Sequence, residues 1–126
     1  NSFGFMDGGI DAAYLAFFGP KIQSTVQDEI SRRPDGQLPV GASIIVQTGH
    51  GRIPFMVVAP TMTMPEAVSA DHAYRALRAV LRIAGNDPEV GRDIYCPGLA
   101  TLTGRVPAEA AAHEMAEAYR DWKNVG

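Results

Sequence analysis

The chain has 126 residues, of which 46% are hydrophobic and 20% charged, and its formal net charge is −3. This length fits one domain and leaves too few residues for a second core, so we expect residues 1–126 to form a single domain. The apolar content excludes intrinsic disorder, and the slightly acidic balance argues against a nucleic-acid-binding surface. The apolar runs are far shorter than the roughly 20 residues that a membrane-spanning helix needs, so we expect no membrane association.

Cys96 is the only cysteine of the sequence, which excludes an internal disulfide and a multi-cysteine metal site. We interpret it as a buried core residue in a strand rather than as a nucleophile paired with a histidine, because free cysteines are commonly buried. His50, His72 and His113 are too far apart in sequence to predict a metal site. We therefore expect no metal and no cofactor, and a reducing cytoplasm as the location.

The first half of the chain predicts two helices followed by a β-hairpin. A short helix over residues 12–18 ends at a Gly-Pro pair, which commonly terminates helices. Apolar residues recur every four positions over residues 21–33, which predicts a second helix with one buried face. Residues 43–47 and 53–59 are apolar and flank a glycine-containing loop, a pattern typical of two antiparallel strands.

The second half predicts a helix, a strand and a final helix. Ser69 is expected to cap a helix over residues 70–84, with an apolar stripe opposite an exposed row of arginines. A short strand is expected over residues 92–97, and Pro107 suits the first position of the last helix. The expected core stripe of this helix comprises Ala111, Met115, Ala118, Tyr119 and Trp122. This order of elements predicts an α/β domain with a mixed sheet covered by helices.

Two glycine-containing loops precede expected helices. The first loop, residues 5–11, reads Phe-Met-Asp-Gly-Gly-Ile-Asp, and the second loop, residues 98–105, reads Gly-Leu-Ala-Thr-Leu-Thr-Gly-Arg. A helix start offers unpaired backbone N–H groups and the positive end of the helix dipole, and glycine lets a phosphate approach the backbone. Each loop could hold a phosphate and the pair a diphosphate, or the glycines could simply form tight turns.

The first loop resembles the ligand loop of the macro domains, a family of ADP-ribose-binding modules. In that family an asparagine at the end of a strand is followed ten residues later by an aspartate, which closes a Gly-Gly-Val-Asp or similar sequence at a helix start. Asn1 and Asp11 have this spacing. The matching segment consists of Gly8, Gly9, Ile10 and Asp11. The second loop also resembles the second phosphate loop of a bacterial subgroup of the family.

The resemblance implies a three-layer α/β/α sandwich with a mixed sheet, which holds ADP-ribose across the carboxyl ends of its strands. It implies two catalytic residues: Asn1, which hydrogen-bonds the distal ribose, and Asp11, which positions or activates a water at the anomeric carbon. It also implies that further strands, with an acidic residue for the adenine amine, precede Asn1. The expected ADP-ribose-binding residues are Gly8, Gly9, Ile10, Gly98, Thr101, Thr103, Gly104 and Arg105. Arg105 could equally pair with Glu109 on the next turn.

The second loop also departs from the family pattern. Ala100 and Leu102 stand where related loops usually have glycine, and Gly104 stands where many members carry an aromatic residue. Three interpretations follow. The protein could hydrolyse ADP-ribose from modified proteins or from O-acetyl-ADP-ribose, it could bind ADP-ribose or another nucleotide without chemistry, or it could be an interaction module with degenerate loops. The expected partners are ADP-ribose or an ADP-ribosylated protein, with no membrane and no specific nucleic acid.

Overall fold

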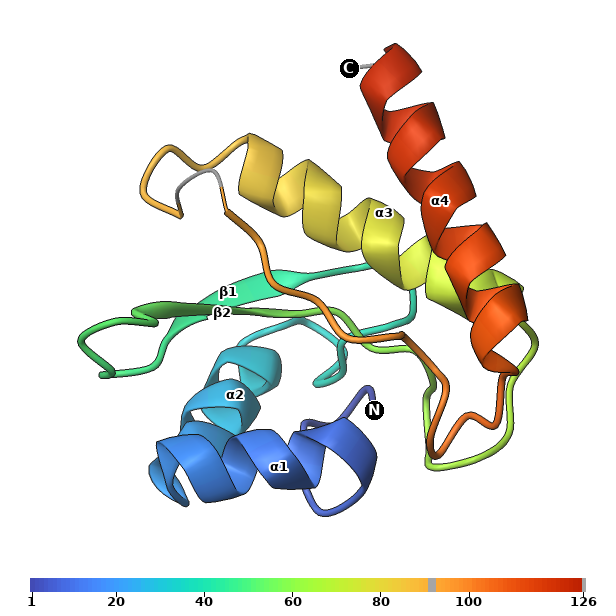
Figure 1. The fold of residues 1–126 in the computed structure, drawn as a ribbon. Helices are drawn as coiled ribbons and strands as arrows, with labels where there is room; N and C mark the ends of the chain where they lie inside the picture. Colours follow the sequence, from blue (N-terminus) through green and yellow to red (C-terminus); the bar gives the residue numbers. More distant parts are fainter. Residues whose placement is uncertain (91–92, 126) are drawn as a thin grey trace.

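The computed structural model describes residues 1–90 and 93–125, and it has four helices and one two-stranded sheet in that part of the chain (Figure 1). In chain order the elements are α1 (Gly9–Phe18), α2 (Lys21–Ser31), β1 (Ile44–Gln47), β2 (Phe55–Val58), α3 (Asp71–Gly85) and α4 (Ala108–Val125). The protein is therefore an α/β protein, as the order of its apolar patterns predicts.

The predicted hairpin is confirmed. β1 and β2 pair antiparallel, and Ile44 lies opposite Val58. The connecting loop closes with a hydrogen bond from the Thr48 amide to the Pro54 carbonyl at 2.9 Å. Gly49 supplies the left-handed conformation of this loop, with a φ of 77° that residues with a side chain rarely adopt.

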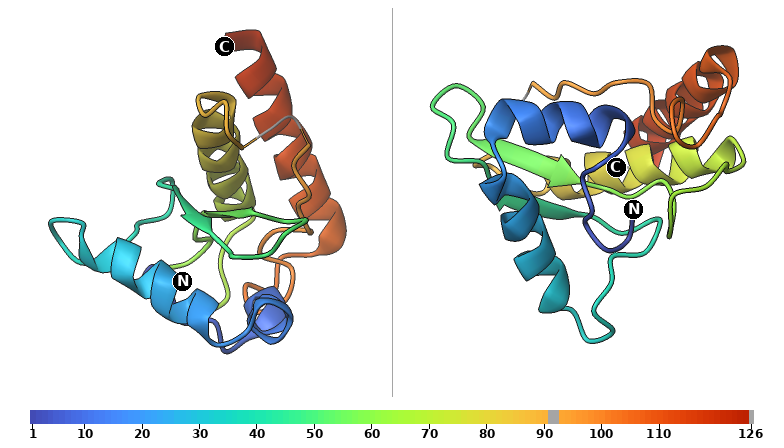
Figure 2. Two further views of the ribbon diagram at one scale, coloured as in Figure 1. Left: turned by 90° about the vertical axis from the view of Figure 1, so that its left-hand side faces the viewer. Right: turned by 90° about the horizontal axis from the view of Figure 1, so that it is seen from below.

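Helices lie on both faces of the hairpin, with α1 and α2 on one side and α3 and α4 on the other (Figures 1 and 2). Because successive side chains of a strand point to opposite faces, β2 contributes to two cores. Met56 and Val58 pack against the cluster that contains Ile22 and Val26 of α2. Val57 packs against the cluster formed by α3 and α4. The hairpin is thus the wall between the two cores.

The first two helices form where the sequence predicts them. α1 ends at Phe18, and Gly19 follows with a φ of 92° while its amide donates to the Leu15 carbonyl at 2.9 Å. α1 begins at Gly9, three residues earlier than expected, so the glycines of the first loop belong to the helix start. The buried face of α2 consists of Ile22, Val26 and Ile30.

The strand expected at residues 92–97 does not form where the structure describes it. Residues 93–97 have no strand geometry, and Arg92 lies outside the described residues. Tyr95 is 92% exposed and Cys96 is exposed as well, so the interpretation of Cys96 as a core residue is wrong. The physical reason is that an apolar pattern forms a strand only beside a pairing partner, and in the described part of the chain the sheet consists of β1 and β2 without residues 93–97.

Two further expectations fail in the last helices. Ser69 does not cap α3, because its hydroxyl donates to the side-chain carboxylate of Asp71 and no side chain caps the helix. Tyr119 is 49% exposed and lies outside the buried stripe of α4. The other predicted stripe residues are buried or pack against the clusters around α3: Ala111, Met115, Ala118 and Trp122.

Candidate functional site

Asn1 organises the turn of residues 1–5. Its side-chain Oδ1 accepts hydrogen bonds from the amides of Phe3 at 3.0 Å and Phe5 at 3.3 Å. Its Nδ2 donates to the Phe5 carbonyl at 3.1 Å. The side-chain amide of Asn1, which is expected to contact a ribose, therefore hydrogen-bonds the backbone at the beginning of the first loop.

The start of α1 presents backbone N–H groups without partners. No side chain caps this helix, and in residues 1–90 and 93–125 the amides of Gly9, Ile10 and Asp11 have no acceptor. Gly9 has a φ of 58°, which favours glycine. Such a helix start carries partial positive charge and suits an anion.

The second loop is held by backbone hydrogen bonds from residues outside it. The Val106 amide donates to the Ala100 carbonyl at 2.9 Å, and the Val68 amide donates to the Gly104 carbonyl at 2.9 Å. Between these anchors, the amides from Thr101 to Gly104 donate to no acceptor in the described part of the chain. This loop therefore also presents unpaired donors.

The two loops lie against each other. A β-carbon placed on Gly9 would lie 3.2 Å from Thr103 Oγ1 and 3.5 Å from Leu102 Cβ, and one placed on Gly8 would lie 3.7 Å from Thr103 Oγ1. The views of Figure 2 agree, because the start of α1 lies beside the chain that leads into α4. Two segments with unpaired amides, about ninety positions apart in sequence, thus lie in contact.

The remaining expected ligand residues frame this contact. Ile10 is 37% exposed on the first turn of α1. The Thr101 hydroxyl donates to the Gly98 carbonyl at 2.9 Å, so it stabilises the second loop from within. Arg105 is exposed and has a φ of 58°, and it forms no ion pair with Glu109 or with any other described acidic residue.

Asp11 lies in the first turn of α1 in a partly dehydrated environment. Burial raises the pKa of its carboxyl, and the charge of Asp7 raises this pKa further. Asp7 and Asp11 therefore lie close enough to interact electrostatically. The pKa of Tyr14 is also raised, first by burial and then by the charges of Cys96 and Asp11.

Two residues near the first loop carry no sequence signal for such a position. Tyr14 reads as an ordinary residue of an apolar helix; it packs against the apolar cluster around α2, and the charge of Asp11 contributes to its raised pKa. Gln23 of α2 accepts a hydrogen bond from the Met6 amide at 2.8 Å. Its partner lies 17 positions earlier, and no local pattern predicts that pairing.

The histidines serve the local structure. His50 Nδ1 accepts the amides of Arg52 and Ile53, each at 3.1 Å, and His72 Nδ1 lies 2.6 Å from the Thr61 carbonyl oxygen. Within residues 1–90 and 93–125, no group of three or more His, Cys, Asp or Glu side chains could hold a metal ion. No described helix is both long and apolar enough to cross a membrane.

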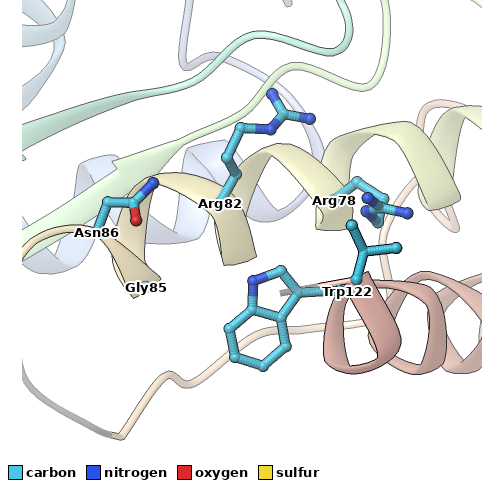
Figure 3. A pocket seen from close by; sticks show the side chains of 6 residues that line it. Arg78, Arg82, Gly85, Asn86 and Trp122 are labelled. Atoms are coloured by element: carbon cyan, nitrogen blue, oxygen red, sulfur yellow. The ribbon is translucent and has the colours of Figure 1, made fainter.

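A hollow of about 280 Å³ lies away from the two loops, near the C-terminal ends of α3 and α4 (Figure 3). Trp122 forms its wall, and a β-carbon on Gly85 would lie 3.2 Å from the indole. Trp122 follows the start of α4 by about 21 Å of helix, at about 1.5 Å per residue. The hollow therefore belongs to the packing of α3 on α4 and not to the loop contact.

Comparison with known proteins identifies the family of this α/β chain. The family described as Macro domain matches residues 1–115. A protein of Aquifex aeolicus (strain VF5), described as an uncharacterized protein, is 32% identical over 124 residues, which cover 98% of this chain and 70% of the Aquifex protein. The chain belongs to the macro domain family, whose members generally bind ADP-ribose.

Proposed function

We propose that the protein binds ADP-ribose at the contact between the two loops and hydrolyses it from modified proteins or from O-acetyl-ADP-ribose. The observation that carries this proposal is that two segments with unpartnered amide groups, the start of α1 and residues 101–104, lie against each other. A diphosphate needs several N–H donors on both sides, and this contact supplies them.

In this proposal the diphosphate lies between Gly8, Gly9 and Ile10 on one side and the second loop on the other. Gly98, Thr101, Thr103 and Gly104 close over the phosphates and the distal ribose. Arg105 adds a positive charge at the loop end, where it is exposed and unpaired among the described residues. Because Leu102 and Thr103 lie against Gly9, the second loop has to move outward when the ligand enters.

Asp11 is the proposed base of the hydrolytic step. On a modified protein, its carboxylate would take a proton from a water as the water oxygen bonds to the anomeric carbon of the distal ribose. The bond from that carbon to the protein side chain breaks in the same step, and the side-chain group leaves with the electron pair. A raised pKa suits this role, because a base works best when its pKa approaches the working pH. Asn1 would contact the distal ribose with the Nδ2 hydrogen that the Phe5 carbonyl leaves free.

The finer features of the fold belong to the same proposal. We infer a single three-layer α/β/α domain with a mixed sheet, in a cytoplasmic protein that binds neither membranes nor specific nucleic acids. Helices on both faces of the hairpin support the layering. The net charge of −3 argues against long anionic polymers as partners.

Calorimetric titration with ADP-ribose tests the binding, with AMP and ribose 5-phosphate as matched partial ligands. We expect saturable heat with ADP-ribose and little with either control, because neither control bridges both loops with a diphosphate. Equal heats for all three ligands would indicate simple phosphate binding, and no heat from folded protein would contradict the proposal.

Turnover of an ADP-ribosylated protein tests the chemistry. We expect Asp11→Ala to bind ADP-ribose while releasing it from the substrate at least about 100-fold more slowly, the range of a general base. A reader without chemistry is the second candidate, favoured by Leu102, whose side chain lies beside Gly9. Saturable binding with no product from either protein would support the reader.

A further inference from the structure

We propose that Gln23 of α2 is a positioning residue for the ligand site. It holds the first loop so that the start of α1, with its free amides, stays against the second loop. This inference rests on the proposed ADP-ribose binding. It adds a residue outside both loops on which that binding depends.

The chain before α1 lies directly on α2. A β-carbon placed on Gly4 would lie 3.1 Å from side-chain atoms of each of three α2 residues, Val26, Gln27 and Ile30. The Met6 side chain is only 4% exposed and belongs to the same apolar cluster as Val26. The chain from Gly4 to Met6, which leads into the first loop, therefore packs directly against α2.

Apolar contacts fix how close the first loop lies to α2. They do not fix the orientation of its peptide groups, because apolar contacts are not directional. The hydrogen bond from the Met6 amide to Gln23 Oε1, at 2.8 Å, supplies a direction. Met6 precedes Gly8 by two residues, so a rotation of its peptide is carried into the start of α1. The hydrogen bond thereby determines the orientation of the backbone amides at the start of α1, which are the proposed diphosphate donors.

The two hydroxyl side chains next to Gln23 hydrogen-bond within α2. The hydroxyls of Ser24 and Thr25 both donate to the Lys21 carbonyl of the same helix, at 2.9 and 3.0 Å. Among the described residues, Gln23 is therefore the side chain of α2 that hydrogen-bonds the first loop. Ser24→Ala offers a matched control that removes a side-chain hydrogen bond without touching the loop.

The test compares ADP-ribose affinity among variants of the full chain. Gln23→Met keeps the length of the side chain and removes the acceptor, and Gln23→Asn shortens it out of reach. Gln23→Glu keeps an acceptor for the Met6 amide. Titrations run in 0.5 M NaCl, where the Debye length of about 4 Å screens the added carboxylate.

We expect Gln23→Met and Gln23→Asn to bind ADP-ribose about threefold to tenfold more weakly than the parent, the effect of one lost hydrogen bond. Gln23→Glu should bind more tightly than both, and Ser24→Ala should match the parent. Hydrogen exchange of the Met6 amide should be fast in the first two variants and slow in Gln23→Glu. Rescue by the glutamate separates positioning from a general loss of stability.

Parent-like affinity in Gln23→Met or in Gln23→Asn, or weak binding in Gln23→Glu despite a protected Met6 amide, overturns the positioning role alone. A parent that binds no ADP-ribose overturns the proposed function and this inference with it. The two failures are therefore distinguishable in one set of titrations.

Discussion

Ala100 holds a backbone conformation that glycine adopts more readily. Its φ is 62°, in the left-handed region where a β-carbon costs about 1–2 kcal/mol. Gly104 lies beside it, and a β-carbon there would lie only 2.7 Å from the Ala100 carbonyl oxygen. The two departures from the family pattern are thus coupled: any side chain at position 104 would displace the backbone that Ala100 now occupies.

Ala100→Gly should stabilise the protein by about 0.5–1 kcal/mol. Relief of the left-handed strain outweighs the larger chain entropy that glycine brings to the unfolded state. Urea denaturation measures the difference. Ala112→Gly, on the exposed face of α4, is the control and should destabilise by about 1 kcal/mol, as glycine does inside helices. A loss of stability in Ala100→Gly would contradict the strain.

Asp11 should make the folded state less stable as the pH rises. Burial raises the pKa of its carboxyl, so the folded state binds this proton more tightly than the unfolded state, whose ordinary pKa is 3.8. The stabilisation from protonation is complete below pH 3.8 and disappears as the pH rises through the raised pKa. Asp11→Asn should therefore be at least as stable as the parent at pH 7, with no difference below pH 3.8.

Urea midpoints of the parent and of Asp11→Asn across this pH range check the sign. Asp35→Asn, in the exposed turn after α2, controls for the removal of one negative charge. An Asp11→Asn variant that is less stable than the parent at pH 7 would mean that the ionised carboxylate stabilises the fold.

At the scale of elements, side chains of α3 hydrogen-bond the segment that leads into β1. Arg75 donates to the Val40 carbonyl at 3.1 Å, and Arg82 donates to the Gly41 carbonyl at 3.5 Å. These arginines are exposed, as the helical pattern predicts, but they are not merely solvated. Their guanidinium groups satisfy carbonyls of an irregular segment that has no strand partner of its own.

Ser43 makes the shortest hydrogen bond of this connection and provides its test. Its hydroxyl donates to the Ala79 carbonyl of α3 at 2.8 Å in a half-buried position, so Ser43→Ala should cost about 1 kcal/mol. Ser24→Ala is the matched control, because the Ser24 hydroxyl donates within α2 at an exposed position. Equal free energies of unfolding of the two variants in urea would show that the hydrogen bond from Ser43 to Ala79 does not stabilise the protein.

At the scale of the whole molecule, the two cores share the hairpin and should unfold together. Trp122, the only tryptophan, belongs to the cluster between α3 and α4. Its fluorescence reports that core, whereas far-ultraviolet circular dichroism reports all four helices. We expect the two urea transitions to coincide, as in a two-state domain. An earlier loss of circular dichroism would show that α1 and α2 unfold separately.

The predictable parts of this fold rest on local signals. The spacing of Ile22, Val26 and Ile30 predicts α2, and the glycine-containing loop between two apolar segments predicts the hairpin. Residues 93–97 carry a similar apolar pattern but form no strand, because a strand depends on a partner that lies elsewhere in the chain. Cys96 is exposed for the same reason, because no strand partner covers it.

The sequence by itself determined the family, the two glycine-containing loops and the position of each loop before a helix, because glycine placement and helix-start chemistry are local properties. Only the tertiary structure decided that Gly9 meets Leu102 and Thr103, and that the Met6 amide meets Gln23. These contacts join residues from 17 to more than 90 positions apart. Contacts between residues so far apart in sequence depend on how the helices pack around the hairpin, and no local pattern encodes that packing.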